Sequence, residues 1–268
     1  MTTFEHAAPR AATPAWLVVT GRELRDLWVA GRALVMMLAF SLLLSVTTYV
    51  VATNQALNLV EQREAVNLTL QLGVAVGALI VLLGAADTLS GERERGTLES
   101  ILLTPAPRRE LVIGKALAAL SLWLGAFVVL VPYVWFIGRG VDIVGVALLS
   151  GFAIGTLLAV FVAGLGLLIS ALAGSNRMSL SISLFILLAL YAPNQLPTGA
   201  QQGWAGDLLL RIDPFSSALH YLGGIVVDGY SAGQDASWLL SPVIAAVLAT
   251  AVALVFGGRV SLRAGERP

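Results

Sequence analysis

The sequence predicts an all-α polytopic membrane bundle, on the basis of its composition and its long apolar runs. Of its 268 residues, 57% are hydrophobic and only 12% are charged. Soluble domains are about half apolar and roughly a quarter charged, so this composition argues against a soluble enzyme. Sixteen Lys and Arg balance sixteen Asp and Glu, which gives no general attraction to nucleic acid. The absence of cysteine excludes disulfides, thiolate metal sites and thiol nucleophiles.

Six runs are long and apolar enough to cross a bilayer, for which a helix needs roughly 20 residues. Within a transmembrane domain of residues 32–260, the predicted spans are about 33–53, 68–89, 111–137, 143–172, 178–193 and 237–258. The turn signal Gly174-Ser175-Asn176 ends the fourth span near Leu172. We expect no secretory signal, because charged residues interrupt the first apolar stretch at once.

The segments outside the spans indicate the orientation. Residues 1–13 are predicted to be a disordered tail, 14–31 an amphipathic helix in the membrane interface, and 261–268 a second tail. If the N-terminus is cytosolic, 13 of the 16 Lys and Arg lie on inner segments. Because inner loops are enriched in these residues, both termini are expected to be cytosolic, in a plasma membrane.

The predicted inner loop, residues 90–109, is the most informative segment. Thr97 is suited to cap a helix of about six residues that Pro105 ends. The side chains of Leu98, Ile101 and Leu102 would form an apolar ridge on this helix. Such a ridge either folds back onto the bundle or docks into a groove on a cytosolic partner, and the pattern alone leaves both open.

The predicted outer segment between spans five and six is too long for a simple connection. Apolar residues recur there with helical spacing, and Asp213-Pro214 divides residues 203–228 into two short helices. These helices either lie flat as an amphipathic surface cap or enter the membrane as a re-entrant hairpin.

The chain lacks the residues that would supply its own chemistry or energy. It has no Gly-x-x-x-x-Gly-Lys-Ser/Thr loop, so we expect no ATP hydrolysis and no enzyme activity by this chain. Its two histidines, His6 and His220, lie far apart, and no metal site is expected. The spans carry ionisable residues only near their inner ends, at Asp87 and Lys115, so transport would need energy from elsewhere. Asp87 is predicted to be an interfacial carboxylate held by Arg93 or Arg95.

A stripe of small residues marks the second span. Gly73, Gly77 and Gly84 lie within about 40° of one another around the helix, with Asp87 at the edge of the stripe. Small residues let helices approach closely, which suits either a subunit interface or transport pathway, or ordinary packing within the chain.

The region from Asp87 to Lys115 carries a family resemblance. It contains Asp-x-x-Ser-Gly-Glu-Arg-Glu-Arg-Gly-Thr-Leu-Glu, then Thr104-Pro105, Arg109 and Gly114-Lys115. This run resembles the first inner loop of type 2 ATP-binding-cassette (ABC) permeases. The similarity is greatest to their six-span subgroup, which includes the permease of the nitrous-oxide-reductase maturation system.

The resemblance implies a permease subunit of a prokaryotic ABC exporter for an unidentified substrate. It implies a second permease copy or homologue and two copies of a separate ATPase subunit, which would bind ATP and Mg. No cofactor is expected in this chain, and its other surroundings would be lipid. The alternative is a membrane anchor or regulator of a cytosolic ATPase that transports nothing.

The resemblance also assigns roles to residues. The coupling helix that contacts the ATPase would comprise Glu92, Arg93, Glu94, Arg95, Gly96, Thr97, Leu98, Glu99, Ile101 and Leu102. The pathway or subunit interface would lie along spans two and five and involve Gly73, Gly77, Gly84, Asp87, Ser179 and Ser183.

Overall fold

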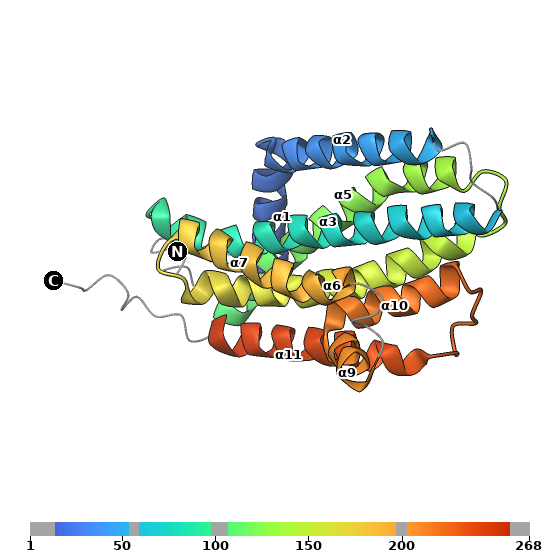
Figure 1. Ribbon diagram of the computed structural model, residues 1–268. Helices are drawn as coiled ribbons and strands as arrows, with labels where there is room; N and C mark the ends of the chain where they lie inside the picture. The colour runs from blue at the N-terminus through green and yellow to red at the C-terminus, as the bar shows by residue number, and fades with distance from the viewer. Residues whose placement is uncertain (1–13, 54–58, 98–106, 197–202, 258–268) are drawn as a thin grey trace, which may run out of the picture.

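The computed structural model describes residues 14–53, 59–97, 107–196 and 203–257. Within these ranges every regular element is helical, and six helices are long and apolar enough to cross a membrane. The predicted all-α bundle with six spans is therefore confirmed. Figure 1 shows the long helices running side by side, with α1 turned across them near one end.

The long helices are α2 (Arg32–Ala52), α3 (Leu59–Glu94), α5 (Arg108–Ile137), α6 (Val144–Leu172), α7 (Asn176–Tyr191) and α11 (Leu240–Gly257). The shorter elements are α1 (Ala15–Leu24), the π-helical turn η1 (Arg25–Val29), the 3-10 turns η2 (Ala192–Gln195) and η3 (Ala236–Leu239), and helices α9 (Trp204–Ile212) and α10 (Pro214–Val226).

Helix α3 is much longer than the apolar run of residues 68–89 that predicted it. Its extensions are rich in Glu, Gln and Arg, which are good helix formers although they are unfavourable in lipid. The first extension is held against the end of α5, because Gln62 Nε2 donates to the carbonyls of Ile137 (2.9 Å) and Arg139 (2.7 Å). Charged residues therefore limit the apolar run without ending the helix.

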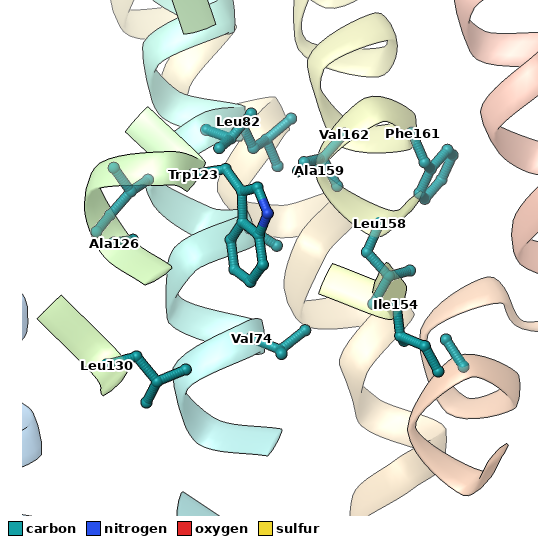
Figure 2. Close-up of a cluster of buried hydrophobic side chains, with 14 of the residues drawn as sticks. Val74, Leu82, Trp123, Ala126, Leu130, Ile154, Leu158, Ala159, Phe161 and Val162 are labelled. Carbon is teal, nitrogen blue, oxygen red and sulfur yellow. The ribbon is translucent and has the colours of Figure 1, made fainter. Parts of the chain in front are cut away.

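The core lies between α3, α5 and α6, around the side chain of Trp123. This indole is 1% exposed, and its Nε1 donates to Thr156 Oγ1 at 2.9 Å. Figure 2 shows it among apolar side chains such as Val74 and Leu158. The ring fits because its neighbours are glycines: a Cβ would lie 2.8 Å from the ring at Gly77 and 2.2 Å from it at Gly155.

Helices α9 and α10 differ in how they meet the bundle. Figure 1 shows α9 turned across the long helices, whereas α10 runs beside α6 and α11. Most of α10 is buried, whereas α9 exposes Trp204 and Leu208.

Asp213 separates the two helices, and its Oδ2 accepts from the backbone N–H of Ser216 at 2.6 Å. The expected cap at Asp213-Pro214 is present, and burial raises the pKa of the Asp213 carboxyl. The depth of these helices in a bilayer stays a prediction.

Replacing Gly155 with Ala should destabilise the protein, because the new methyl group collides with the indole of Trp123. Overpacking of this kind costs about 1–3 kcal/mol, which should lower the midpoint of thermal unfolding in detergent. Gly145→Ala is the matched control on the same helix, since nothing lies within 4 Å of a Cβ there. Equal midpoints for the two variants would contradict this account of the core.

Candidate functional site: a charged network at one end of the bundle

One end of the bundle collects the buried ionic contacts. Helices α3 and α6 end there, α5 and α7 begin there, and α1 packs against it (Figure 1). We call this the charged end. The opposite end, where α5 turns into α6, is the distal end.

Lys115 is the centre of the charged end. Its side chain on α5 is 2% exposed, and Nζ lies 2.7 Å from Glu23 Oε1 of α1 and 2.7 Å from Glu92 Oε1 of α3. Two carboxylates thus share one buried cation. Removing one member of a buried ionic group leaves an uncompensated charge, so this contact holds α1, α3 and α5 together.

Helix α1 is docked along α5. The backbone N–H of Trp16 donates to Glu110 Oε2 at 3.1 Å, and in the following turn η1 Trp28 Nε1 donates to Ser121 Oγ at 3.0 Å. At the crossing, a Cβ on Gly114 would lie 2.7 Å from Val19, so only glycine allows this approach. The helix predicted over residues 14–31 is therefore attached to the bundle on one side.

Asp87 joins three helices. Its carboxylate pairs with Arg32 of α2, and its Oδ1 accepts from Asn176 Nδ2 of α7 at 2.7 Å. The predicted ion pairs of Asp87 with Arg93 or Arg95 are absent from the described structure, so this prediction was wrong. Arg93 lies about 240° around α3 from Asp87 and turns to α6. Arg95 Nη2 does lie near Asp87 Oδ1, since both approach Gly91, but Asp87 is paired with Arg32 instead.

Arg93 and Ser170 connect α3 to the end of α6. The guanidinium of Arg93 donates to the carbonyls of Ala173 and Ala171, which lie at the C-terminal end of α6, where a cation is favourable. Ser170 Oγ accepts from the backbone N–H groups of Leu89 (3.0 Å) and Ser90 (2.9 Å). The last turns of α3 are therefore bonded to α2, α5, α6 and α7.

A Schellman motif ends α3 at Gly96. The N–H of Gly96 donates to the carbonyl of Arg93 at 3.2 Å, and the N–H of Thr97 donates to that of Glu92 at 3.0 Å. Gly96 has φ +69°, a left-handed conformation that costs other residues about 1–2 kcal/mol. The chain direction after α3 is thus set by one glycine.

The residues predicted to form the coupling helix divide into three groups. Glu92 and Arg93 are in the last turn of α3 and bonded within the bundle. Glu94, Arg95, Gly96 and Thr97 are exposed at the charged end. Leu98, Glu99, Ile101 and Leu102 lie outside the described residues, as do the predicted tails 1–13 and 261–268.

The glycine stripe on α3 faces α5 of the same chain. A Cβ would lie 2.4 Å from Leu130 at Gly73, and 2.5 Å from Leu122 at Gly84. Gly77 faces Trp123, as described above. These contacts are intramolecular packing, the second of the two alternatives stated for this stripe.

Two cavities flank Asp87 and Arg32. One, of about 280 Å³, lies between the α1–η1 segment and α3 and includes Glu92 in its lining. The other, of about 420 Å³, lies between α2, α3 and α7 and is mainly apolar beyond Asp87.

Ser179 and Ser183 of α7 are fully buried, and Ser179 Oγ donates to the carbonyl of Ala86 on α3 at 2.8 Å. Both serines therefore lie at the α3–α7 contact of this chain.

Comparison with known proteins identifies the family. A family model described as "ABC-2 family transporter protein" matches residues 17–262. The chain belongs to this family. It is thus a transmembrane permease component of an ABC transporter, a type of subunit that works with an ABC ATPase and is surrounded by lipid. A search of curated proteins gave no match.

Sequence reasoning missed several residues of this ABC-2 permease's charged end. Glu23, Arg32 and Asn176 were not selected, although each lies where an apolar run begins or shortly before it. Polar residues that flank different runs at the same end of a bundle are candidates to meet one another. That signal was present, but the pairing depends on the order of helices around α3.

Lys115→Met should be strongly destabilising, because it leaves Glu23 and Glu92 close together without their cation. Breaking a buried pair costs about 3–5 kcal/mol, seen as a lower unfolding midpoint. Adding Glu92→Gln to this variant should recover part of the loss, since one buried charge is removed. Asp207→Asn is the control, because it breaks only the exposed pair with Arg211, which is worth about 1 kcal/mol or less. A Lys115→Met variant as stable as the control would refute the central position of Lys115.

Proposed function

We propose that this ABC-2 permease is the membrane half of a prokaryotic exporter. Two permease chains, identical or homologous, would pair with two copies of an ATPase subunit that binds ATP and Mg²⁺. The ATPases would dock at the charged end, on the segment that follows Gly96. The assignment to the six-span subgroup similar to the nitrous-oxide-reductase maturation permease is part of this proposal.

The distribution of positive charge supports docking from the cytosol. Arg93, Arg95, Arg108 and Arg109 flank the proposed docking segment, and inner loops of membrane proteins are enriched in such residues. The distal end is correspondingly placed outside, in the plasma membrane. Both chain termini then lie in the cytosol.

The observation that carries the proposal is the continuity between the docking segment and the charged network. The segment leaves α3 through the Schellman motif, one turn after Glu92, which is bonded to Lys115. Five residues before Glu92, Asp87 is bonded to α2 and α7. A displacement of the segment would therefore reach α1, α2, α5 and α7 together, because these helices are joined to the end of α3 through Lys115 and Asp87.

The source of energy follows from the distribution of charge. Between their ends, the apolar runs that form the six spans contain no Asp, Glu, Lys or Arg. Ion-coupled transporters retain such groups within the membrane, so here the work is assigned to ATP. An ATP-loaded partner can shift the permease between two states only if it binds one of them more tightly.

The cargo pathway is assigned to the side of α3 and α7 that faces away from α5. The cavity of about 420 Å³ between α2, α3 and α7 opens there, and Ser181 belongs to its lining. Movement of α7 relative to α3 would change this cavity directly, because the cavity lies between these helices. A displacement of α3 would reach α7, because Asn176 and Ser179 of α7 are bonded to Asp87 and Ala86 of α3.

The coupling is tested by loosening the docking segment in the permease–ATPase complex. Gly96-Thr97-Leu98 is replaced with Gly-Ser-Gly, and the control is the same replacement at Gly140-Val141-Asp142, in the turn between α5 and α6 at the distal end, which likewise keeps a glycine of positive φ in place. We expect the first variant to assemble but to lose the stimulation of ATP hydrolysis by the permease, while the control retains it. Unchanged turnover in the first variant would refute mechanical coupling and favour an anchor that transports nothing.

A further inference from the structure

A second polar cavity lies away from the charged end, between α10 and the loop that follows it. It has a volume of about 380 Å³ and is bounded by α10 and residues 227–235 on one side and by α3, η2 and α9 on the other. Its lining includes Gln71, Ser216, His220, Tyr221, Asp228 and Asp235. The proposed coupling mechanism makes no use of this cavity.

The lining is acidic. Asp228 and Asp235 contribute two carboxylates, and neither takes part in an ion pair within the described ranges 14–53, 59–97, 107–196 and 203–257. Burial lowers the pKa of His220; Asp235 and Asp228 oppose this shift, and Arg211 adds to it. His220 is therefore neutral at pH 7 and does not balance the carboxylates.

Two arginines lie near the cavity but are not among its lining residues. Arg211 is paired with Asp207 and lies over the ring of Trp238, 4.3 Å from its centre. Arg63 approaches Gly229 from α3, with Nη1 3.8 Å from where a Cβ would be. No Lys or Arg is among the described residues that line the cavity.

The lining also offers hydrogen-bond acceptors that are not in use. Gln71 Nε2 already donates to Asn67 Oδ1 and to the carbonyl of Leu219, both at 3.3 Å, which leaves its Oε1. The hydroxyl of Tyr221 donates to the carbonyl of Ala232 at 2.6 Å. Ser216 Oγ is fully buried and has no hydrogen-bond partner among the described residues. A buried polar atom without a partner costs free energy, so a ligand that bonds to it is favoured.

The acidic loop is held in place. The N–H of Tyr230 donates to the carbonyl of Gly224 at 3.0 Å, and the N–H of Gln234 donates to that of Ser231 at 2.9 Å. Asp235 has φ +56°, a left-handed conformation that only this non-glycine residue adopts in the described part of the chain. The ring of Trp238 packs on His220, with centres 3.9 Å apart. A backbone held in this way lowers the ordering cost of binding.

We propose that this cavity binds a small organic cation with N–H donors, such as a primary ammonium or guanidinium compound. The two carboxylates supply the charge, and the oxygens of Gln71 and Ser216 accept hydrogen bonds from the ligand. Its volume falls in the range of small-molecule sites. That the ligand is the cargo rests on the proposed export function, whereas the binding itself does not.

Binding is tested on the full-length permease in nanodiscs of neutral lipid, without ATPase. The probes are 1,4-diaminobutane, its uncharged analogue 1,4-butanediol, the dianion succinate and Ca²⁺, titrated calorimetrically at low ionic strength. We expect saturable binding of the diamine alone. The double variant Asp228→Asn/Asp235→Asn should bind it at least about tenfold more weakly, as expected for hydrogen bonds to charged groups.

The variants are chosen so that the loop stays folded. Asn tolerates a left-handed conformation better than other residues apart from Gly, so Asp235→Asn preserves the backbone at this position. Asp142→Asn is the matched control, since it neutralises an exposed carboxylate in another distal turn that does not line the cavity. Equal unfolding midpoints of the variants verify that a loss of binding is local.

Three results would overturn the proposal: no binding of the diamine, equal affinity in the double variant, or a preference for the diol or Ca²⁺. The role as cargo is tested separately in the complex with the ATPase. Stimulation of ATP hydrolysis by the diamine, abolished in the double variant, would support it. Binding without stimulation would refute the cargo role and leave the proposed coupling at the charged end intact.

Discussion

The buried cation of Lys115 is the constraint on which the charged end depends. A lysine that has lost its water must be compensated, and two carboxylates from different helices provide the compensation here. Glu23 can reach Lys115 only because α1 lies close to α5, and that approach requires glycine at position 114. Glu92 can reach it only if α3 continues beyond the apolar run. The position of α1, the length of α3 and the start of α5 are thus tied to one ionic contact.

The two ends of the bundle are stabilised differently. The charged end uses ion pairs, capped helix ends and hydrogen bonds between neighbouring helices. Around α10, the contacts are hydrogen bonds and packed rings, such as that between His220 and Trp238. Between the ends, large side chains such as Trp123 fit against glycines. A packed core of this kind changes shape reluctantly, so under the proposed mechanism a mechanical input at one end would move helices as units.

Much of the fold could be predicted from local sequence signals. The apolar runs predict six spans, and the turn at Gly174-Ser175 and the cap at Asp213 follow from residue types with well-understood backbone preferences. The true length of α3 was missed, because a search for charge-free runs measures what lipid tolerates rather than where a helix ends.

The site was predicted only in part. Asp87 was recognised as an unusual residue, but its partners on α2 and α7 depend on the arrangement of helices, which one sequence does not specify. The acidic cavity was missed for the same reason, since its residues come from several elements.

The central claim is that the segment following α3 faces the cytosol and is covered by the ATPase. The chain has no cysteine, so a single one can be introduced without background. Arg95→Cys at the charged end is compared with Asp142→Cys at the distal end, using a maleimide that does not cross membranes. We predict labelling of position 142 in intact cells, and of position 95 only after permeabilisation and less when the ATPase is bound. Labelling of position 95 in intact cells, or labelling that the ATPase does not reduce, would contradict the account.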